Sequence, residues 1–227
     1  MNEKKGRLFV LEGLDGSGKA TQAAALEQAL TAQGCPVRKI TFPNYASEAS
    51  APVRMYLHGD FGQKAGEVNA FAASSFFAVD RYASYRTDWG DFYEAGGILI
   101  ADRYTTSNAV HQCSKLPQNQ WADFLHWLFH YEYDLLGLPA PDAVIYLSVD
   151  PAVSQKLMTG RYHGDESKKD IHEKDVAYLE ASRRAAEYCA AHLGWTTVAC
   201  TAHDAMRPVA DIHREVLALV RQKMEAE

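Results

Sequence analysis

Short apolar segments alternate along this chain with longer segments in which apolar residues recur at helical spacing. The short segments predict strands over 7–12, 37–42, 97–101, 143–149 and 196–200. The longer segments predict helices over 19–33, 67–89, 119–135, 173–192 and 208–225. Because strands that alternate with helices form a parallel sheet covered on both faces, we expect a three-layer α/β/α fold with a mainly parallel central sheet. Ligands of such sheets bind at the carboxyl ends of the strands.

The composition is ordinary for a globular protein and argues against several classes of function. The 227 residues, 47% apolar and 23% charged, predict a single domain over 1–227. A net charge of −6 argues against non-specific binding to nucleic acid or to an anionic membrane. We expect no membrane span and no signal peptide, since no apolar run approaches ~20 residues. Four scattered cysteines without a C-x-x-C pair predict reduced thiols in a cytoplasmic protein.

A glycine-rich stretch connects the first predicted strand to the first predicted helix. It reads GLDGSGKAT and nearly fits the pattern G-x-x-x-x-G-K-[ST], whose small residues let backbone amides approach phosphate oxygens. The helix N-terminus adds its positive end, and Lys19 can reach the terminal phosphates. The alternative is a glycine-rich turn with a surface lysine. We predict a phosphate-binding loop made by Gly13, Gly16, Ser17, Gly18, Lys19, Ala20 and Thr21.

Ala20 stands where this pattern places a hydroxyl that helps to hold magnesium. Thr21 need not take over the role, because successive helical residues are rotated by ~100°. Magnesium would instead be held by phosphates and water, since it keeps several waters readily. Asp102, at the end of a predicted strand, is a candidate to bind Mg²⁺ directly or through water. The guanidinium of Arg103 can donate two parallel hydrogen bonds to a phosphate. The alternative is that Asp102 and Arg103 only form an ion pair with each other at the end of the strand.

The segment over 159–172 differs in composition from the rest of the chain. It is polar, begins near a glycine and is mixed in charge. One interpretation is a solvated loop. The other is a short mobile lid that brings cations over bound phosphates, with Arg161 as the first candidate and Lys168 and Lys169 as weaker ones.

Several motifs together resemble the thymidylate kinases, a family of nucleoside monophosphate kinases with the P-loop NTPase fold. The phosphate loop has the family type E-G-x-D-G-x-G-K over 12–19, and a segment D-R-[YH]-x-x-S stands at 102–107. The order Lys-Ala-Thr-Gln after the loop is similar to that of adenylate kinases and their relatives. Three further matches are Phe42-Pro43, Phe77 with Arg81, and Leu-Pro-x-Pro-Asp over 138–142. The resemblance runs from about residue 7 to 220.

The resemblance implies an acceptor site in which Phe77 stacks on thymine and Arg81 bonds to the exposed edge of the base. A spacing of four residues puts both on one helix face. The alternatives are a core aromatic for Phe77 and an ion pair with Asp80 or Asp88 for Arg81. The remaining acceptor residues that the resemblance implies are Asp15, Phe42, Pro43, Arg54, Arg103, Ser107, Asn108 and His111.

Two departures from the family pattern limit this transfer of roles. Some relatives have an arginine inside the phosphate loop, where this chain has Gly16 and Ser17. The catalytic cation would then come from the lid, and Arg161 is the residue we choose. The family commonly has Tyr or Phe where this chain has His111, and that aromatic helps to exclude a ribose 2′-hydroxyl. Discrimination of the sugar is therefore open, and the alternative is that His111 merely packs there as a neutral imidazole.

The function that the resemblance implies is transfer of the γ-phosphoryl group of ATP to dTMP, giving dTDP and ADP. Phosphoryl transfer needs positioning and charge stabilisation rather than covalent chemistry. The expected catalytic set is Lys19, Arg103, Arg161 and Asp15, with Mg²⁺ as cofactor. Two alternatives remain: a kinase of the same fold for another nucleotide or deoxynucleoside, and a non-catalytic nucleotide-binding regulator.

Two segments outside these motifs carry further expectations. The helix over 121–131 has more aromatic residues than one buried face needs, and the resemblance also suggests a homodimer. The stretch over 201–208, between the last strand and the last helix, is where the resemblance suggests that adenine packs. The alternative there is a plain connection between the two elements.

Overall fold

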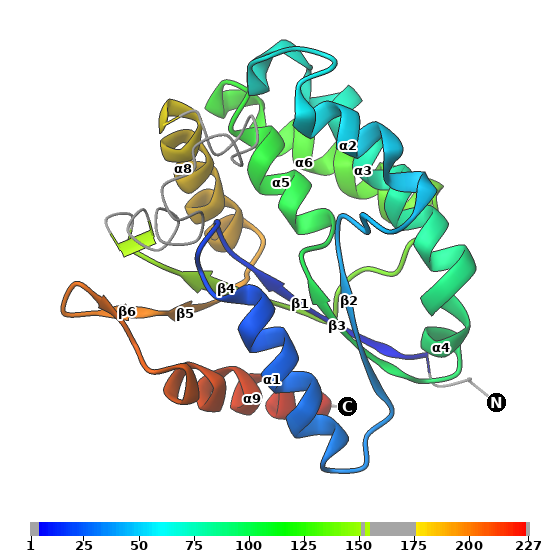
Figure 1. The fold of residues 1–227 in the computed structure, drawn as a ribbon, viewed down its shortest axis with the longest axis vertical. Coiled ribbons are helices and arrows are strands. Elements are labelled where there is room, and N and C mark those ends of the chain that lie inside the picture. The colour runs from blue at the N-terminus through cyan, green and yellow to red at the C-terminus, as the bar shows by residue number, and fades with distance from the viewer. Residues whose placement is uncertain (1–4, 151–152, 155–175, 226–227) are drawn as a thin grey trace.

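The computed structural model describes residues 5–150, 153–154 and 176–225 (Figure 1). At its centre is a five-stranded sheet in the order β2-β3-β1-β4-β5, and every neighbouring pair is parallel. The strands are β1 (Arg7–Glu12), β2 (Val37–Thr41), β3 (Ile98–Asp102), β4 (Ala143–Ser148) and β5 (Thr196–Ala199). Each ends within one residue of its predicted bounds, so the predicted parallel α/β fold is confirmed.

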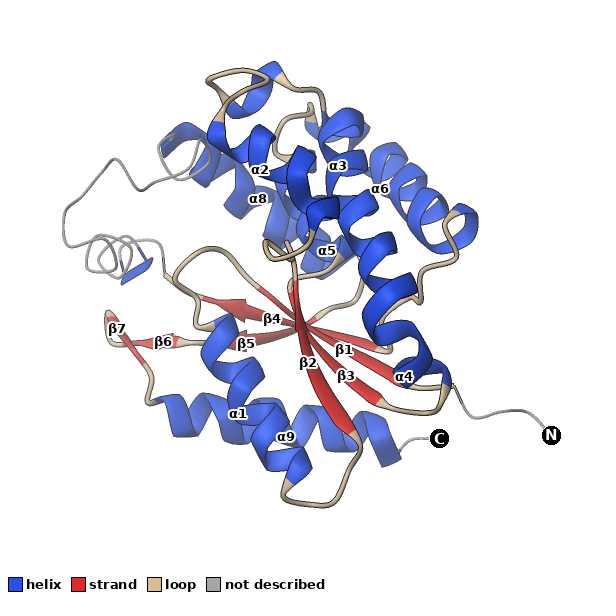
Figure 2. Cartoon of the chain, turned by 45° about the vertical axis from the view of Figure 1, so that its right-hand side comes forward, coloured by secondary structure: helices blue, strands red, loops and turns tan. Residues whose placement is uncertain are grey.

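Helices cover both faces of the central sheet (Figure 2). They are α1 (Lys19–Thr31), α2 (Ala51–His58), α3 (Ala70–Ser84), α4 (Gly90–Glu94), α5 (Thr105–Cys113), α6 (Trp121–Phe129), α8 (Val176–His192) and α9 (Val209–Glu225). On one face, Phe9 and Leu11 of β1 pack with Leu26 of α1, and α9 lies beside α1. Leu8 and Val10 alternate with them and pack on the opposite face, as the two-residue period of a strand requires.

Two of the predicted long helices change their winding part-way. The helix predicted over 67–89 is α3 followed by a π-helical turn at Tyr85–Trp89, and α4 continues it beyond the predicted end. The helix predicted over 119–135 is α6 followed by a π-helical turn at His130–Leu135. A π turn closes its hydrogen bonds over five residues, so side chains after it leave the 3.6-residue pattern. Glu132, in the second π turn, is fully buried.

The sequence patterns do not predict α2, α5 or the hairpin of β6 (Thr201–Ala202) and β7 (Ala205–Met206). Helix α5 begins with the poor helix formers Thr105, Thr106 and Ser107. Their hydroxyls donate to buried carboxylates elsewhere in the fold, and these tertiary contacts stabilise the helix. Three short 3-10 turns complete the described elements: η1 (Glu48–Ser50), η2 (Ala65–Glu67) and η4 (Gln118–Gln120).

The carboxyl ends of β1 and β3 lie side by side at one edge of the sheet, so the two motifs that follow them meet there. The predicted lid over 159–172, with Arg161, lies outside the described residues. Among the residues that are described, no helix has the length and apolar character needed to span a membrane. The prediction of a single domain over 1–227 stays a prediction.

Candidate active site

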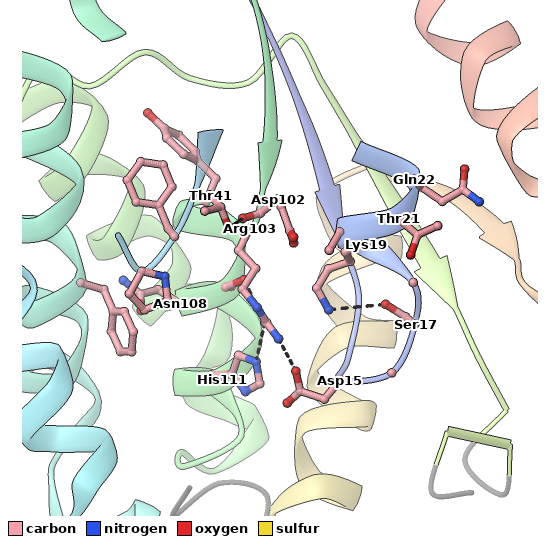
Figure 3. A pocket seen from close by; sticks show the side chains of 18 of the residues that line it. Asp15, Ser17, Lys19, Thr21, Gln22, Thr41, Asp102, Arg103, Asn108 and His111 are labelled. Carbon is pink, nitrogen blue, oxygen red and sulfur yellow. Dashed lines mark hydrogen bonds and ion pairs between the residues drawn. The ribbon is translucent and has the colours of Figure 1, made fainter. Parts of the chain in front are cut away.

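The loop between β1 and α1 has the geometry of a phosphate-binding loop (Figure 3). Gly16 and Gly18 adopt left-handed backbone angles, with φ of 79° and 87°, which glycine adopts without steric cost. Lys19 lies back across the loop, and its Nζ donates to the carbonyl oxygen of Gly13 at 2.7 Å. Burial, reinforced by the charge of Arg103, lowers the pKa of Lys19 to about 8. The amine of Lys19 is therefore partly desolvated inside the loop, and a bound phosphate group would attract its positive charge.

Arg103 links this loop to helix α5 (Figure 3). Its Nη2 donates to Oδ1 of Asp15 at 2.5 Å, while its Nη1 lies 3.4 Å from Nε2 of His111 and 3.5 Å from Oγ of Ser107. The salt bridge joins Arg103 to Asp15 and not to Asp102. The alternative of an ion pair between Asp102 and Arg103 is therefore wrong. Arg103 also has a positive φ of 68°. Such a conformation costs about 1–3 kcal/mol in a residue other than glycine and is concentrated at functional sites.

Glu12, at the end of β1, holds the phosphate loop against α5. Its buried carboxylate accepts from the backbone N–H of Gly13 at 3.0 Å and from the hydroxyls of Thr106 at 2.6 Å and Ser107 at 2.8 Å. These three donors satisfy the buried carboxylate of Glu12, to which water has no access. The sequence motifs assign no separate role to Glu12, although its place immediately before the glycine-rich loop is visible in the sequence.

Arg81 is buried against Glu132. Its Nε and Nη2 donate to the two carboxylate oxygens at 2.6 and 2.7 Å, and the two side chains are 2% and 0% exposed. The partners named as alternatives, Asp80 and Asp88, are therefore wrong, and Asp88 pairs with Arg38 instead. Although burial opposes the charge, Glu132 raises the pKa of Arg81. Arg81 also lines the pocket described below.

Glu132 positions a second polar group of the same region. Nδ2 of Asn108 lies 3.3 Å from Oε1 of Glu132 and 3.3 Å from the carbonyl oxygen of Ser74. Because both neighbours are acceptors, the orientation of the amide is determined, and Oδ1 is left as an acceptor. Thr105 donates to the same carboxylate at 2.7 Å. Sequence reasoning missed Glu132, whose only signal is an acidic residue inside an aromatic helical segment.

A single pocket of about 940 Å³ joins the phosphate loop to this buried cluster. In the other direction it reaches Met206 and Arg207 beside the β6–β7 hairpin, and Val209 and Ile212 at the start of α9. The predicted site residues that line it are Asp15, Gly16, Ser17, Gly18, Lys19, Ala20, Thr21, Phe42, Pro43, Phe77, Arg81, Asp102, Arg103, Ser107, Asn108 and His111. The fold thus brings nearly the whole predicted set to one cavity.

Comparison with known proteins decides the family. A family model described as thymidylate kinase matches residues 11–216. The chain belongs to the thymidylate kinase family. A thymidylate kinase of Mycobacterium tuberculosis is 32% identical over 171 residues, 74% of this chain and 78% of that protein. One of Schizosaccharomyces pombe is 27% identical over 218 residues, 96% of this chain and 93% of that protein.

A solved structure gives the same result for the fold. The thymidylate kinase of Candida albicans superposes with a TM-score of 0.70 at 19% identity, covering 98% of this chain and 94% of that chain. The predicted membership of the thymidylate kinase family, the predicted enzyme class and the fold are thereby confirmed.

Two residues predicted from the thymidylate kinase motifs do not line the pocket. Arg54 donates from Nη1 to the carbonyl oxygen of Ser47 at 3.0 Å and to Oγ of Ser50 at 2.6 Å, contacts that hold the turn before α2. Gly13 is required by packing, because a Cβ there would lie 2.8 Å from the backbone carbonyl oxygen of Leu147 and 2.5 Å from Oγ of Ser17. The hydrogen bonds of Arg54 are local, and Gly13 lies against the backbone of β4. The other predicted site residues that the structure describes line the cavity.

His111, the departure from the thymidylate kinase pattern, is buried beside Arg103. Burial, followed by the charge of Arg103, lowers the pKa of His111 to about 3. The imidazole is therefore neutral at physiological pH. Because it also lines the pocket, its effect on sugar discrimination stays a prediction.

Gln112, the next residue along α5, is a pocket group that sequence reasoning missed. It is fully buried and lines the pocket. Neither its Nε2 nor its Oε1 has a hydrogen-bond partner among the described residues. Buried amides are normally hydrogen-bonded, so Gln112 keeps an unused donor and an unused acceptor among the described residues. Its sequence signal is its position immediately after His111.

The residues around the phosphate loop fit a magnesium ion held mainly by phosphates and water. Asp102 ends β3 and lines the pocket, and its negative charge acts on Lys19. The described part of the chain contains no group of three or more His, Cys, Asp or Glu residues arranged for a metal. Magnesium does not require such a cage, since one or two carboxylates together with substrate phosphates are its usual ligands.

Proposed function

We propose that this member of the thymidylate kinase family transfers the γ-phosphoryl group of ATP to dTMP through the pocket that joins the phosphate loop to the Arg81–Glu132 pair. That continuous pocket is the observation that carries the proposal, because Lys19 of the phosphate loop and Asn108 of α5 lie on opposite sides of Arg103 in it. In the reaction an oxygen of the acceptor phosphate forms a bond to the γ-phosphorus. The bond from the γ-phosphorus to its bridging oxygen breaks, and ADP leaves.

At the phosphate end, the chain supplies positive charge and orientation. Lys19 and the loop amides would bind the donor phosphates. Arg103, directed by its salt bridge to Asp15, would bind the acceptor phosphate and stabilise charge in the transition state. Mg²⁺, held by the phosphates and through water by Asp102, would withdraw charge from the phosphate oxygens. We retain Arg161 as the proposed lid cation, on the sequence argument alone.

At the base end, the cluster around Glu132 supplies a matched donor and acceptor. Arg81 can donate to a carbonyl oxygen of the base, and Oδ1 of Asn108 can accept from a ring N–H. A 4-oxo pyrimidine presents that pair of groups, whereas cytosine presents an amino group and an unprotonated ring nitrogen. Phe77 lines the same region and would stack on the ring, and Gln112 offers a further amide. At the far end, Met206 and Arg207 would contact adenine.

The direct test is ADP release from ATP and Mg²⁺ with dTMP, dUMP, dCMP, dGMP, AMP and thymidine in parallel. We expect dTMP to be the best acceptor. For dCMP, kcat/KM should be lower by about 10²-fold or more, because the amino group would face Arg81 and leave buried groups unpaired. Equal activity with dCMP would remove Arg81 and Asn108 from base recognition. The absence of any acceptor-dependent ADP would favour the non-catalytic alternative.

We also propose that the chain forms a homodimer through an apolar face of α3. Phe71, Val79 and Tyr82 are 45%, 49% and 41% exposed, and their spacing places them on one side of the helix. Phe71 contacts Trp127 of α6 at 4.6 Å between ring centroids, so the patch continues onto a second helix. Light scattering at micromolar concentration should give twice the chain mass, and Val79→Asp should give a monomer. A wild-type monomer contradicts this proposal.

A cytoplasmic location is proposed from the cysteines. All four, Cys35, Cys113, Cys189 and Cys200, are free thiols, and three of them are buried. Such thiols persist in a reducing compartment. Cell fractionation with an antibody against the chain tests this, and recovery outside the cytoplasm contradicts it.

A further inference from the structure

Tyr178 of α8 contacts His111 from the side opposite Arg103. Its Oη lies 3.2 Å from Nδ1 of His111 and 3.1 Å from the backbone carbonyl oxygen of the same residue. The two rings are nearly parallel, at 15°, with centroids 6.1 Å apart. Both ring nitrogens of His111 therefore have a defined neighbour: Tyr178 at Nδ1 and Arg103 at Nε2.

The hydrogen bonds of this chain of groups admit one arrangement of protons. A guanidinium can only donate, so Nε2 of His111 must be the unprotonated acceptor facing Arg103. In a neutral imidazole the proton is then on Nδ1, which donates to Oη of Tyr178. The hydroxyl of Tyr178 in turn donates its own proton to the carbonyl oxygen of His111, which can only accept. Each donor meets an acceptor along the whole path.

The charges around His111 agree with a neutral ring in this tautomer. Among the described residues, Arg103, Lys19 and Lys115 disfavour a positive charge on the ring, and Asp15 favours it. The other neutral tautomer would direct an N–H of the ring at the guanidinium of Arg103. That arrangement places two donors face to face and would move Arg103 away from His111.

We propose that Tyr178 is a positioning residue that locks His111 in the Nδ1–H tautomer, so that Nε2 holds Arg103 in place beside Asp15. The consequence concerns the acceptor side of the reaction, because Arg103 is the group assigned to the acceptor phosphate. This part of the inference rests on the proposed function, whereas the tautomer itself does not. His111, the residue that departs from the family pattern, thus contributes a ring-nitrogen acceptor where phenylalanine would contribute only bulk.

The test combines a spectroscopic and a kinetic measurement on the full chain. Long-range ¹H–¹⁵N correlation spectra distinguish Nδ1–H from Nε2–H in a neutral histidine, and His111→Gln identifies the signal. We expect Nδ1–H in the wild type, and a mixed or Nε2–H state in Tyr178→Phe. In that variant, kcat/KM for dTMP should fall about 3- to 10-fold, as expected for one lost hydrogen bond, with the KM for ATP unchanged.

Two further variants separate positioning from general effects of substitution. Tyr188→Phe removes a hydroxyl from the same helix, where the ring contacts Trp121 and His192, and should change neither readout. In the His111→Gln background there is no tautomer to lock, so adding Tyr178→Phe should have no further effect on dTMP kinetics. Equal additive losses in both backgrounds would show a merely structural role for Tyr178 and overturn the proposal.

Three other results would also overturn the inference. These are an Nε2–H tautomer in the wild type, an unchanged tautomer in Tyr178→Phe, and a changed tautomer with unchanged dTMP kinetics. The first measurement needs only the wild-type protein, so it stands even when Tyr178→Phe does not fold. If the wild type phosphorylates no acceptor, the proposed function fails, while the spectra still decide the tautomer.

Discussion

Replacing Lys19 with methionine is expected to lower kcat for the phosphorylation of dTMP by about 10³-fold. The Nζ atom now donates to carbonyl oxygens inside the phosphate loop, and methionine keeps the length of the side chain without the charge. Because burial disfavours the cation, thermal stability should not decrease. Lys39→Met, on an exposed position of β2, is the matched control and should leave kcat unchanged. If Lys19→Met retains activity, the loop does not take part in the reaction.

The same residue predicts a pH dependence of ATP binding. Burial lowers the pKa of Lys19 to about 8, so the amine is cationic below pH 8 and loses its proton as the pH rises above 8. Since phosphates bind the cationic form, ATP should bind about tenfold more weakly at pH 9 than at pH 7. Lys19→Met cannot titrate and should show a flat profile. An affinity that is constant up to pH 9 in the wild type contradicts the assignment.

Glu132→Gln is expected to lower the free energy of unfolding by about 3 kcal/mol or more and to weaken dTMP binding strongly. The substitution leaves the guanidinium of Arg81 buried without its counter-charge, which typically costs 3–5 kcal/mol. It also places an amide donor on the residue whose carboxylate now accepts from four donors, two of Arg81 and one each of Thr105 and Asn108. Urea denaturation gives the stability, and steady-state kinetics gives the KM for dTMP.

Two controls make this result specific. Glu187→Gln removes one partner of an exposed ion pair with Arg183, and stability should change by about 0.5 kcal/mol at most. The double variant Arg81→Met with Glu132→Leu replaces the buried pair by apolar groups and should recover most of the lost stability. It should not recover dTMP binding. Full recovery of both would mean that the pair serves packing alone.

The local patterns of the sequence determined the layers of the fold and the place of the phosphate loop. Strand and helix periods depend on near neighbours, and a glycine-rich turn between β1 and α1 needs only φ angles that glycine adopts readily. The position of Arg103 immediately after a strand was likewise enough to bring it to the carboxyl edge of the sheet.

Only the tertiary structure decided which charged and polar groups meet. Arg81 pairs with Glu132 across 51 positions and Arg103 with Asp15 across 88, although nearer acidic residues were available to both. The choice depends on burial and on exact side-chain geometry, which no local period encodes. Helix α5 also depends on long-range contacts, because its poor helix formers donate to carboxylates from β1 and from the π turn after α6. The sequence by itself determined which edge of the sheet carries the pocket, and long-range pairing of buried charges decided how its side chains are oriented.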